Sequence, residues 1–256
     1  MTRRLAKRKR PDRDIHLLKG QNKVDSGIFD DKTMILLSKF YNKGIIEQLL
    51  FPVARGKEAD VYIASAGASE DVKGKTYVIV KFFRIETSSF FKMEDYIVGD
   101  PRFKKIGRTK IAIVKTWCKK EFGNLSLARH AGANAPKPYM FNGSILAMEF
   151  IGAEDGTVSP QLKDMAVESP EIFLDNILQQ VRLLYKSNLV HADLSEFNIL
   201  VKDNQPYIID FGQAVSIKHP NAMEFLERDI RVVLNYFGKK YEIKRDAKEV
   251  LEQIIK

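Results

Sequence analysis

The spacing of hydrophobic residues along the chain predicts strands in its first half and helices in its second. Apolar runs at 61–64, 77–83 and 144–151 are bounded by glycine or polar residues, which is typical of short strands. Residues 116–129 have the spacing of a single helix that ends near Gly132. These positions predict a strand-rich unit that carries one helix.

Residues after 168 repeat their hydrophobic positions at helical spacing. The Ser-Pro pair at 169–170 indicates a helix start, because proline fits the first helical position. Residues 221–224 resemble a capping box whose helix would end at Gly238, and residues 245–256 predict a last amphipathic helix. The second half is therefore expected to be mainly helical.

The remaining segments complete the expected organisation. Residues 1–24 show no hydrophobic periodicity and are expected to form a mobile tail. Asp30 or Asp31 is expected to cap a helix, and residues 45–50 to add a further helical turn. The expected fold class is α+β. A basic tail and N-terminal helical extension are expected over 1–48, a strand-rich lobe over 49–151 and a helical lobe over 152–256. The strand-rich lobe is expected to contain a flexible insertion at about 84–110.

The composition is that of a globular protein, with 45% hydrophobic and 29% charged residues among 256. No apolar run is long enough to span a bilayer, and no apolar segment follows the basic N-terminus, so neither a membrane segment nor a secretory signal is expected. The single cysteine, Cys118, excludes an internal disulfide and favours a reducing compartment, the cytoplasm. One cysteine and four histidines make a zinc site unexpected.

The net charge of +9 is unevenly distributed. Residues 1–14 and 102–120 are rich in Lys and Arg, and the second segment contains no acidic residue. One interpretation is a solvated tail and a solvated loop. The other is contact with a polyanion, for which RNA is the first candidate.

The strongest chemical signal is the pattern His-x-Asp-x-x-x-x-Asn at 191–198, followed by Asp210-Phe-Gly. Two apolar runs around a polar turn predict a hairpin here, and folding it about Asn204 places Asn198 opposite Asp210. An amide oxygen and a carboxylate suit Mg²⁺, which takes substrate phosphates as further ligands. Asp193 adds a carboxylate at the same place, available to accept a proton from a hydroxyl.

This pattern resembles the catalytic and metal loops of protein kinases, which implies roles for residues upstream. Lys81 ends an apolar strand, like the kinase lysine that holds the phosphates of ATP, and Glu121 lies in a helix at the place of that lysine's partner. Taken alone, each of these charges is common on protein surfaces. The strand that ends at Ile151 occupies the position of the hinge between the kinase lobes, so Met148, Glu149 and Ile151 are expected at the adenine.

The glycine-rich loop of ordinary kinases is replaced here by a segment with one glycine, Gly56-Lys-Glu-Ala-Asp-Val-Tyr. This segment and the sequence HADLSEFNIL at 191–200 resemble the RIO family of atypical protein kinases, whose phosphate loop reads G-K-E-[AS]-[DN]-V-Y. The resemblance extends from about residue 26 to residue 240, and the segment before Gly56 is expected to be too short for the winged helix of the second RIO branch. The first branch, of archaeal type, is therefore expected, with Gly56, Lys57 and Val61 in contact with the nucleotide.

The resemblance implies a two-lobed protein-kinase-like fold with a strand-rich N-lobe and a reduced helical C-lobe. It implies a serine/threonine kinase or ATPase that uses ATP and Mg²⁺, with Mn²⁺ as a substitute, and acts in maturation of the small ribosomal subunit. A precursor particle of that subunit, or its rRNA, would be the partner. The implied roles are Asp193 as catalytic base, Lys81 as a catalytic residue, Asn198 and Asp210 as metal ligands, and Asp210 as a site of transient phosphorylation.

Departures from the ordinary kinase pattern leave alternatives open. Ala192 replaces the arginine that usually precedes the catalytic aspartate, so control by a phosphorylated loop paired with that arginine is not expected. No Ala-Pro-Glu motif follows Gly212, and the short remaining segment is expected to lack the platform on which ordinary kinases dock peptides. Whether the substrate is a protein is therefore left open. Two alternatives remain: a ribosome-assembly binding factor that uses ATP only as a conformational switch, and a small-molecule phosphotransferase of the aminoglycoside or choline kinase type.

Overall fold

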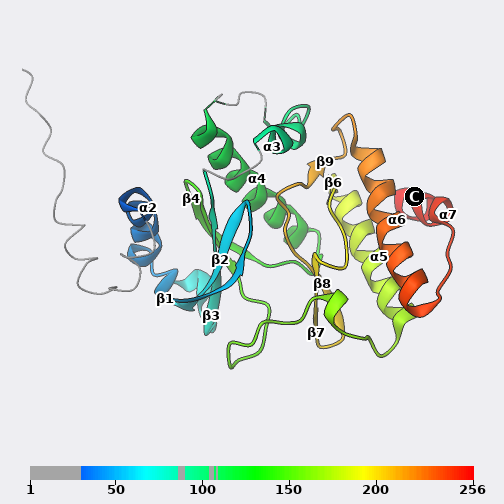
Figure 1. Ribbon diagram of the computed structural model, residues 1–256, viewed down its shortest axis with the longest axis horizontal. Helices are drawn as coiled ribbons and strands as arrows, with labels where there is room; N and C mark the ends of the chain where they lie inside the picture. Colours follow the sequence, from blue (N-terminus) through cyan, green and yellow to red (C-terminus); the bar gives the residue numbers. More distant parts are fainter. Residues whose placement is uncertain (1–29, 86–89, 104–106, 108) are drawn as a thin grey trace, which may run out of the picture.

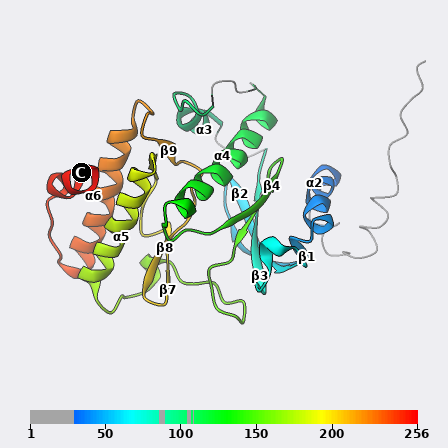
Figure 2. The same cartoon turned by 180° about the vertical axis from the view of Figure 1, so that it is seen from behind.

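The computed structural model describes residues 30–85, 90–103, 107 and 109–256, so the tail expected at 1–24 lies outside the described residues. A strand-rich lobe and a helical lobe lie side by side, with the C-terminus in the helical lobe (Figures 1 and 2). The expected α+β, two-lobed architecture is therefore confirmed. Within the described ranges, no helix has the length and apolar character needed to cross a membrane.

The first lobe is built on a five-stranded antiparallel sheet with the strand order β1-β2-β3-β5-β4. Side chains alternate between the two faces along each strand. On β3, Val78 and Val80 belong to a core on one face, whereas Ile79 and Lys81 face the cleft between the lobes. The strands are β1 (Ile46–Arg55), β2 (Ala59–Ala66), β3 (Tyr77–Phe83), β4 (Pro138–Asn142) and β5 (Ile145–Glu149), with a short 3-10 helix η2 (Glu70–Val72) between β2 and β3.

Helix α2 (Asp31–Asn42) covers the face of the sheet that lies away from the cleft (Figure 1). The expected capping residue is Asp30, whose carboxylate accepts a hydrogen bond from the Thr33 backbone N–H at 2.8 Å. Leu37 and Phe40 are fully buried against the sheet. The predicted N-terminal helical extension is thus confirmed for the described residues.

The helical turn expected at 45–50 is wrong, because these residues begin strand β1. Ile46 and Leu49 are both buried and three residues apart, which imitates helical spacing. The β1–β2 ladder contains register shifts on both sides of Gln48 and Leu49, and such bulges let residues three apart face the same side of a strand. The bulges, rather than a helix, explain the hydrophobic pattern.

The segment expected to be a flexible insertion contains helix α3 (Phe90–Ile97), which packs on α4 (Figure 1). Helix α4 (Lys110–His130) begins earlier than expected, because Thr109 caps it by accepting a hydrogen bond from the Ala112 N–H at 3.2 Å. One interpretation of the basic segment 102–120 was a solvated loop. The buried Ile113 and Val114 show instead that the helix already has an apolar face before residue 116.

The second lobe packs three helices against two short pairs of strands (Figure 1). The hydrophobic face expected on its first helix is confirmed, since Phe173, Ile177, Val181 and Leu184 are buried. The elements are α5 (Pro170–Lys186), α6 (Ala222–Tyr241), α7 (Ala247–Ile255), β6 (Leu189–Val190) paired with β9 (Val215–Ser216), β7 (Ile199–Lys202) paired with β8 (Gln205–Ile208), and the 3-10 helix η3 (Leu162–Asp164).

Two expectations for α6 are wrong. Asn221 is the N-cap residue, but its side chain makes no capping hydrogen bond. The helix also continues through Gly238 to Tyr241, and it ends where Glu242 adopts a left-handed backbone with φ of 60°. The buried Phe237 and the partly buried Tyr241 pack in the core on both sides of the glycine, and this packing outweighs the weak helix propensity of glycine.

Candidate active site

A cavity of about 680 Å³ lies between the two lobes. The β1–β2 hairpin, β3, β5, β7 and the segment after β8 form its walls. Every residue predicted to contact nucleotide or metal lines this one cavity: Gly56, Lys57, Val61, Lys81, Glu121, Met148, Glu149, Ile151, Asn198 and Asp210. The structure therefore brings together residues that lie more than 150 positions apart in the sequence.

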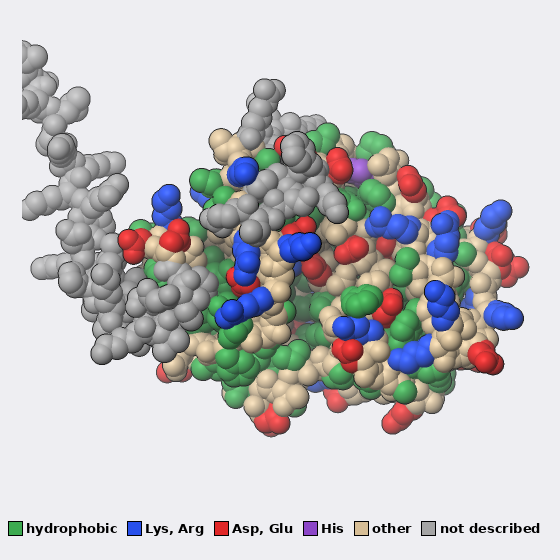
Figure 3. All heavy atoms as spheres, viewed as in Figure 1, with side chains coloured by type: hydrophobic (Ala, Val, Ile, Leu, Met, Phe, Trp, Pro, Cys, Tyr) green, Lys and Arg blue, Asp and Glu red, His purple; other side chains and the backbone are tan. Residues whose placement is uncertain are grey.

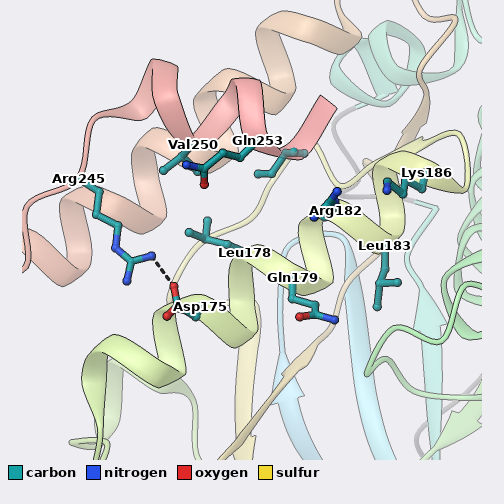
Figure 4. Close-up of a pocket in the computed structure, with 10 residues that line it drawn as sticks. Asp175, Leu178, Gln179, Arg182, Leu183, Lys186, Arg245, Val250 and Gln253 are labelled. Atoms are coloured by element: carbon teal, nitrogen blue, oxygen red, sulfur yellow. Dashed lines mark hydrogen bonds and ion pairs between the residues drawn. The ribbon is translucent and has the colours of Figure 1, made fainter. Parts of the chain in front are cut away.

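A second cavity of about 510 Å³ lies between α5 and α7 in the helical lobe. Figure 4 shows that charged and apolar side chains share its lining, with Arg245 ion-paired to Asp175 at one side and Arg182 and Lys186 on α5. It contains none of the residues predicted for the site. The candidate chemistry is therefore in the cleft between the lobes.

Lys81 joins the two lobes through ion pairs. Its Nζ lies 2.9 Å from both carboxylate oxygens of Glu121 on α4 and 3.0 Å from Oδ1 of Asp210 in the helical lobe. Burial disfavours the ammonium, but the carboxylates of Asp210 and Glu121 outweigh it and raise the pKa of Lys81. Burial also raises the pKa of Glu121, while Lys81 opposes that shift. Lys81 is therefore a fixed cation at the inner end of the cavity.

Asp210 occupies an unusual backbone position. It follows strand β8 with a left-handed φ of 60°, and its side chain is 49% exposed. Burial would raise its pKa, but the neighbouring Lys81 ammonium holds the pKa of Asp210 below its usual range. Asp210 is thus a charged carboxylate that faces the cavity.

The register expected for the hairpin is wrong by one residue. Asp203 and Asn204 both have positive φ and form a two-residue turn, so Ile199 pairs with Ile208 and the Ile209 N–H donates to the carbonyl of Asn198 at 2.9 Å. Asn198 is therefore opposite Ile209, one position before Asp210. The left-handed backbone at that next position compensates by turning its side chain toward the same cavity.

Asp193 lies beside this cavity without lining it. Its Oδ2 accepts hydrogen bonds from the side-chain amides of Asn198 at 3.2 Å and Gln213 at 3.1 Å. Burial and the nearby charge of Asp210 raise the pKa of Asp193 to about 6. A half-buried carboxylate with neutral partners and a pKa near the working pH suits a general base.

Two of the groups expected at the adenine are already hydrogen-bonded within the protein. The carboxylate of Glu149 is ion-paired to Lys75 at 2.8 Å and also accepts from the Lys137 N–H at 3.2 Å. The carbonyl of Ile151 accepts from the Ser159 N–H at 3.1 Å. Adenine recognition by the side chain of Glu149 is therefore disfavoured.

Sequence reasoning missed the residues that hold the catalytic loop. Asp229 on α6 accepts hydrogen bonds from the backbone N–H groups of Ala192 at 2.7 Å and Leu194 at 3.0 Å, on either side of Asp193. Burial raises the pKa of Asp229 to about 7. Nothing in the local sequence distinguishes this aspartate from the charged residues around it on an amphipathic helix.

His191 has a supporting role that the sequence pattern did not define. Its Nε2 lies 3.0 Å from the carbonyl of Ile209, and its ring packs edge-on against Phe211 with centroids 4.9 Å apart. Burial lowers its pKa to about 4, so the ring is neutral and Nε2–H donates to that carbonyl. His191 thus ties the catalytic loop to the end of β8.

The oxygen ligands present suit Mg²⁺. The amide nitrogen of Asn198 donates to Asp193, so its Oδ1 is left for the cavity, where Asp210 supplies a carboxylate. The described part of the chain has no cluster of three or more His, Cys, Asp or Glu side chains that could hold a metal. One or two protein oxygens completed by phosphates is the usual coordination of Mg²⁺ in phosphoryl-transfer sites.

Comparisons with known proteins agree with this geometry. A sequence model of the RIO domain family matches residues 60–250. The chain is 40% identical over 238 residues to the RIO-type serine/threonine-protein kinase Rio1 of Haloferax volcanii. That alignment covers 91% of this chain and 80% of the relative. The chain is 44% identical over 185 residues to the protein of the same name in Thermoplasma acidophilum, in an alignment that covers 72% of this chain and 97% of the relative.

The fold is shared with a solved kinase. The crystal structure of the Rio2 kinase-ADP/Mg²⁺-phosphoaspartate complex from Chaetomium thermophilum superposes with a TM-score of 0.66 over 88% of this chain and 66% of that chain, at 20% identity. The match supports the expected protein-kinase-like fold. The family model and the two archaeal relatives show that the chain belongs to the RIO family of serine/threonine-protein kinases, as a member of the archaeal Rio1 type.

Proposed function

We propose that the cleft binds ATP with Mg²⁺ and that the chain transfers the γ-phosphate to a serine or threonine hydroxyl. The observation that carries this proposal is Lys81, fixed by Glu121 and Asp210 inside a cavity of about 680 Å³. Phosphoryl transfer depends mainly on positioning and charge stabilisation, and a fixed cation beside metal-binding oxygens supplies both.

Each residue has a distinct task in this proposal. Lys81 contacts the phosphates, and Asn198 and Asp210 would hold Mg²⁺, which neutralises phosphate charge when bound. The hydroxyl oxygen of the substrate bonds to the γ-phosphorus, the bond from that phosphorus to the β–γ bridging oxygen breaks, and ADP leaves. Asp193 accepts the hydroxyl proton, and Asn198 and Gln213 keep its carboxylate oriented.

A second candidate is an ATPase that works through phosphorylated Asp210. The supporting observation is that the Asp210 carboxylate is 49% exposed. The Chaetomium Rio2 structure is described as a phosphoaspartate complex. Here a carboxylate oxygen of Asp210 would bond to the γ-phosphorus as ADP leaves, and water would later release inorganic phosphate.

The test is incubation of the purified chain with γ-labelled ATP and Mg²⁺. Kinase activity predicts label on serine or threonine that resists hydroxylamine. The ATPase route predicts label that hydroxylamine removes, together with released inorganic phosphate. Absence of both label and phosphate release would contradict the proposed function.

We also propose that the chain acts in the cytoplasm on a precursor of the small ribosomal subunit or its rRNA. The support is the net charge of +9, and Figure 3 shows Lys and Arg side chains over both lobes. The basic segment 102–120 contributes less than its composition suggests, because Lys120 is buried and Arg102 is ion-paired to Asp100. The exposed Lys115 and Lys119 remain available for such contacts.

ATP turnover with and without pre-ribosomal particles tests this role. Strong stimulation by particles favours an assembly ATPase, and the alternative of a binding factor that only switches with ATP predicts binding without turnover. The family assignment removes the small-molecule phosphotransferase alternative. Replacing Lys115 and Lys119 by Ala should reduce the salt dependence of RNA binding, since each neutralised phosphate releases counterions.

A further inference from the structure

Helix α4 makes a second connection to the active site besides Glu121. Lys120 is fully buried, and its Nζ donates to the backbone carbonyls of Gly212 at 2.8 Å and Ala214 at 2.6 Å. These carbonyls belong to the segment directly after Asp210, here called the metal loop (residues 210–214). A buried lysine normally pairs with a carboxylate, but this one is used to hold backbone.

Asn124 makes the same kind of contact one helical turn further along. Its Nδ2 donates to the carbonyls of Phe211 at 2.8 Å and Ala214 at 2.7 Å. Its Oδ1 accepts from Arg102 at 2.8 Å, and because arginine can only donate, this contact fixes which end of the amide faces the metal loop. Lys120 and Asn124 lie four residues apart and therefore on one face of α4.

The packing of the metal loop on α4 is equally close. A side chain at Gly212 would place its Cβ 2.8 Å from the indole nitrogen of Trp117, so the loop backbone lies directly against the helix. Asp100, the partner of Arg102, also accepts from the Ser216 N–H at 3.3 Å just beyond the loop. The metal loop is thus fixed by α4 and by the segment that precedes it.

We propose that Lys120 and Asn124 are positioning residues that hold the metal loop so that the carboxylate of Asp210 faces the metal–phosphate site. Both act on carbonyls one to four residues after Asp210, while Glu121 on the same helix fixes the opposing Lys81. Any displacement of α4 then moves the phosphate lysine and the metal carboxylate together. The inference rests on the proposed role of Asp210 as a metal ligand.

The contact does not depend on the charge of Lys120. Burial, helped by the charge of Arg102, lowers the pKa of Lys120 to about 7. A neutral amine still has two N–H bonds, which is one for each carbonyl. The geometry can therefore persist over the pH range in which the enzyme is assayed.

The test is the effect of Mg²⁺ on ADP affinity, measured by calorimetry on the full chain in excess Mg²⁺ and in EDTA. Lys120→Met removes the donor and keeps most of the side-chain volume. Because residues that orient a metal ligand are typically worth 10–100-fold in metal affinity, the gain in ADP affinity from Mg²⁺ should fall by about tenfold. Affinity in EDTA should be unchanged, since Lys81 and the hinge stay in place.

Lys39→Met, at an exposed lysine on α2 outside the proposed nucleotide and RNA contacts, is the control and should behave as the wild type. If Lys120 has a purely structural role, Lys120→Met should lower the melting temperature but leave unchanged the increase in ADP affinity that Mg²⁺ gives. That result would overturn the inference. If Lys120→Met does not fold, Asn124→Ser carries the test under the same criterion. If the ADP affinity of the wild type does not depend on Mg²⁺, the proposed function itself is contradicted.

Discussion

Two carboxylates of the active site are held in opposite ways. Glu121, on α4, is 1% exposed and accepts two hydrogen bonds of 2.9 Å from a single cation, Lys81. Asp193, in the catalytic loop, is half-buried and accepts only from neutral amides, those of Asn198 and Gln213. Burial raises the pKa of both groups, to about 7 for Glu121 and about 6 for Asp193.

The difference separates a group that positions from a group that reacts. A carboxylate that is 1% exposed and bound to an ammonium cannot be reached by a substrate hydroxyl, even though burial raises its pKa. A carboxylate bound to amides keeps its basicity and its orientation together. Glu121 should therefore act mainly on nucleotide binding, and Asp193 mainly on the chemical step.

The largest effect is expected from Asp193→Asn. The amide keeps the shape of the side chain but cannot accept the hydroxyl proton, so kcat for phosphoryl transfer should fall by roughly 10²–10⁴. ADP affinity should change little, because Asp193 does not line the nucleotide cavity. Steady-state kinetics and calorimetry measure the two quantities.

Asp203→Asn is a suitable control for this substitution. It makes the same chemical change in the hairpin turn, where φ is 50° and asparagine is well tolerated. Its kinetics should match the wild type. Full activity in Asp193→Asn would show that another group accepts the proton.

The next largest effect is expected from Glu121→Gln. The amide can accept one hydrogen bond from Lys81 but loses the ionic component, which is worth roughly 1.5 kcal/mol for a charged hydrogen bond, or about tenfold. This loss should raise the KM for ATP about tenfold with a smaller change in kcat. Glu70→Gln, in an exposed ion pair with Lys73, should leave both constants unchanged. If Glu121→Gln lowers only kcat, then Glu121 acts on the chemical step as Asp193 does, and the proposed difference between the two carboxylates is wrong.

The pH dependence of kcat/KM should report the basicity of Asp193 in the free enzyme. The carboxylate must be ionised to accept a proton, and its pKa is raised to about 6. Activity should therefore be lost as the pH falls through 6, by about tenfold at pH 5 relative to the plateau. This acid limb should persist in Glu121→Gln and disappear in Asp193→Asn. Its survival in Asp193→Asn would assign it to a different group.

The sequence identified the reacting groups because they lie in short local patterns. Asp193, Asn198 and Asp210 lie within a few residues of one hairpin, and alternation along β3 points Lys81 into the cleft. The hairpin register was wrong by one residue because the length of the turn, and not the hydrophobic pattern, sets the pairing. The error did not move Asp210 out of the site, since its left-handed backbone turns the side chain back toward the cavity.

The supporting groups could not be found in this way. Asp229 and Lys120 are single charges on helices, at least 35 and more than 90 positions from the loops they hold. Their partners are backbone atoms, which leave no signal in the sequence. Lys120 was even counted with a basic surface segment. Only the tertiary packing shows that these charges are buried and bonded.

The smallest effect concerns Gln213, which sequence reasoning also missed. Its Nε2 donates to Asp193 Oδ2 at 3.1 Å and so favours the ionised carboxylate. Gln213→Leu removes this hydrogen bond, whose net value is roughly 0.5–1.5 kcal/mol, so the acid limb should move up by about half a pH unit to one unit. At pH 8 the carboxylate is still ionised, and kcat/KM should fall less than about threefold. An acid limb that stays in place would mean that Asn198 alone sets the basicity of Asp193, and that the comparison with Glu121 depends on one amide rather than two.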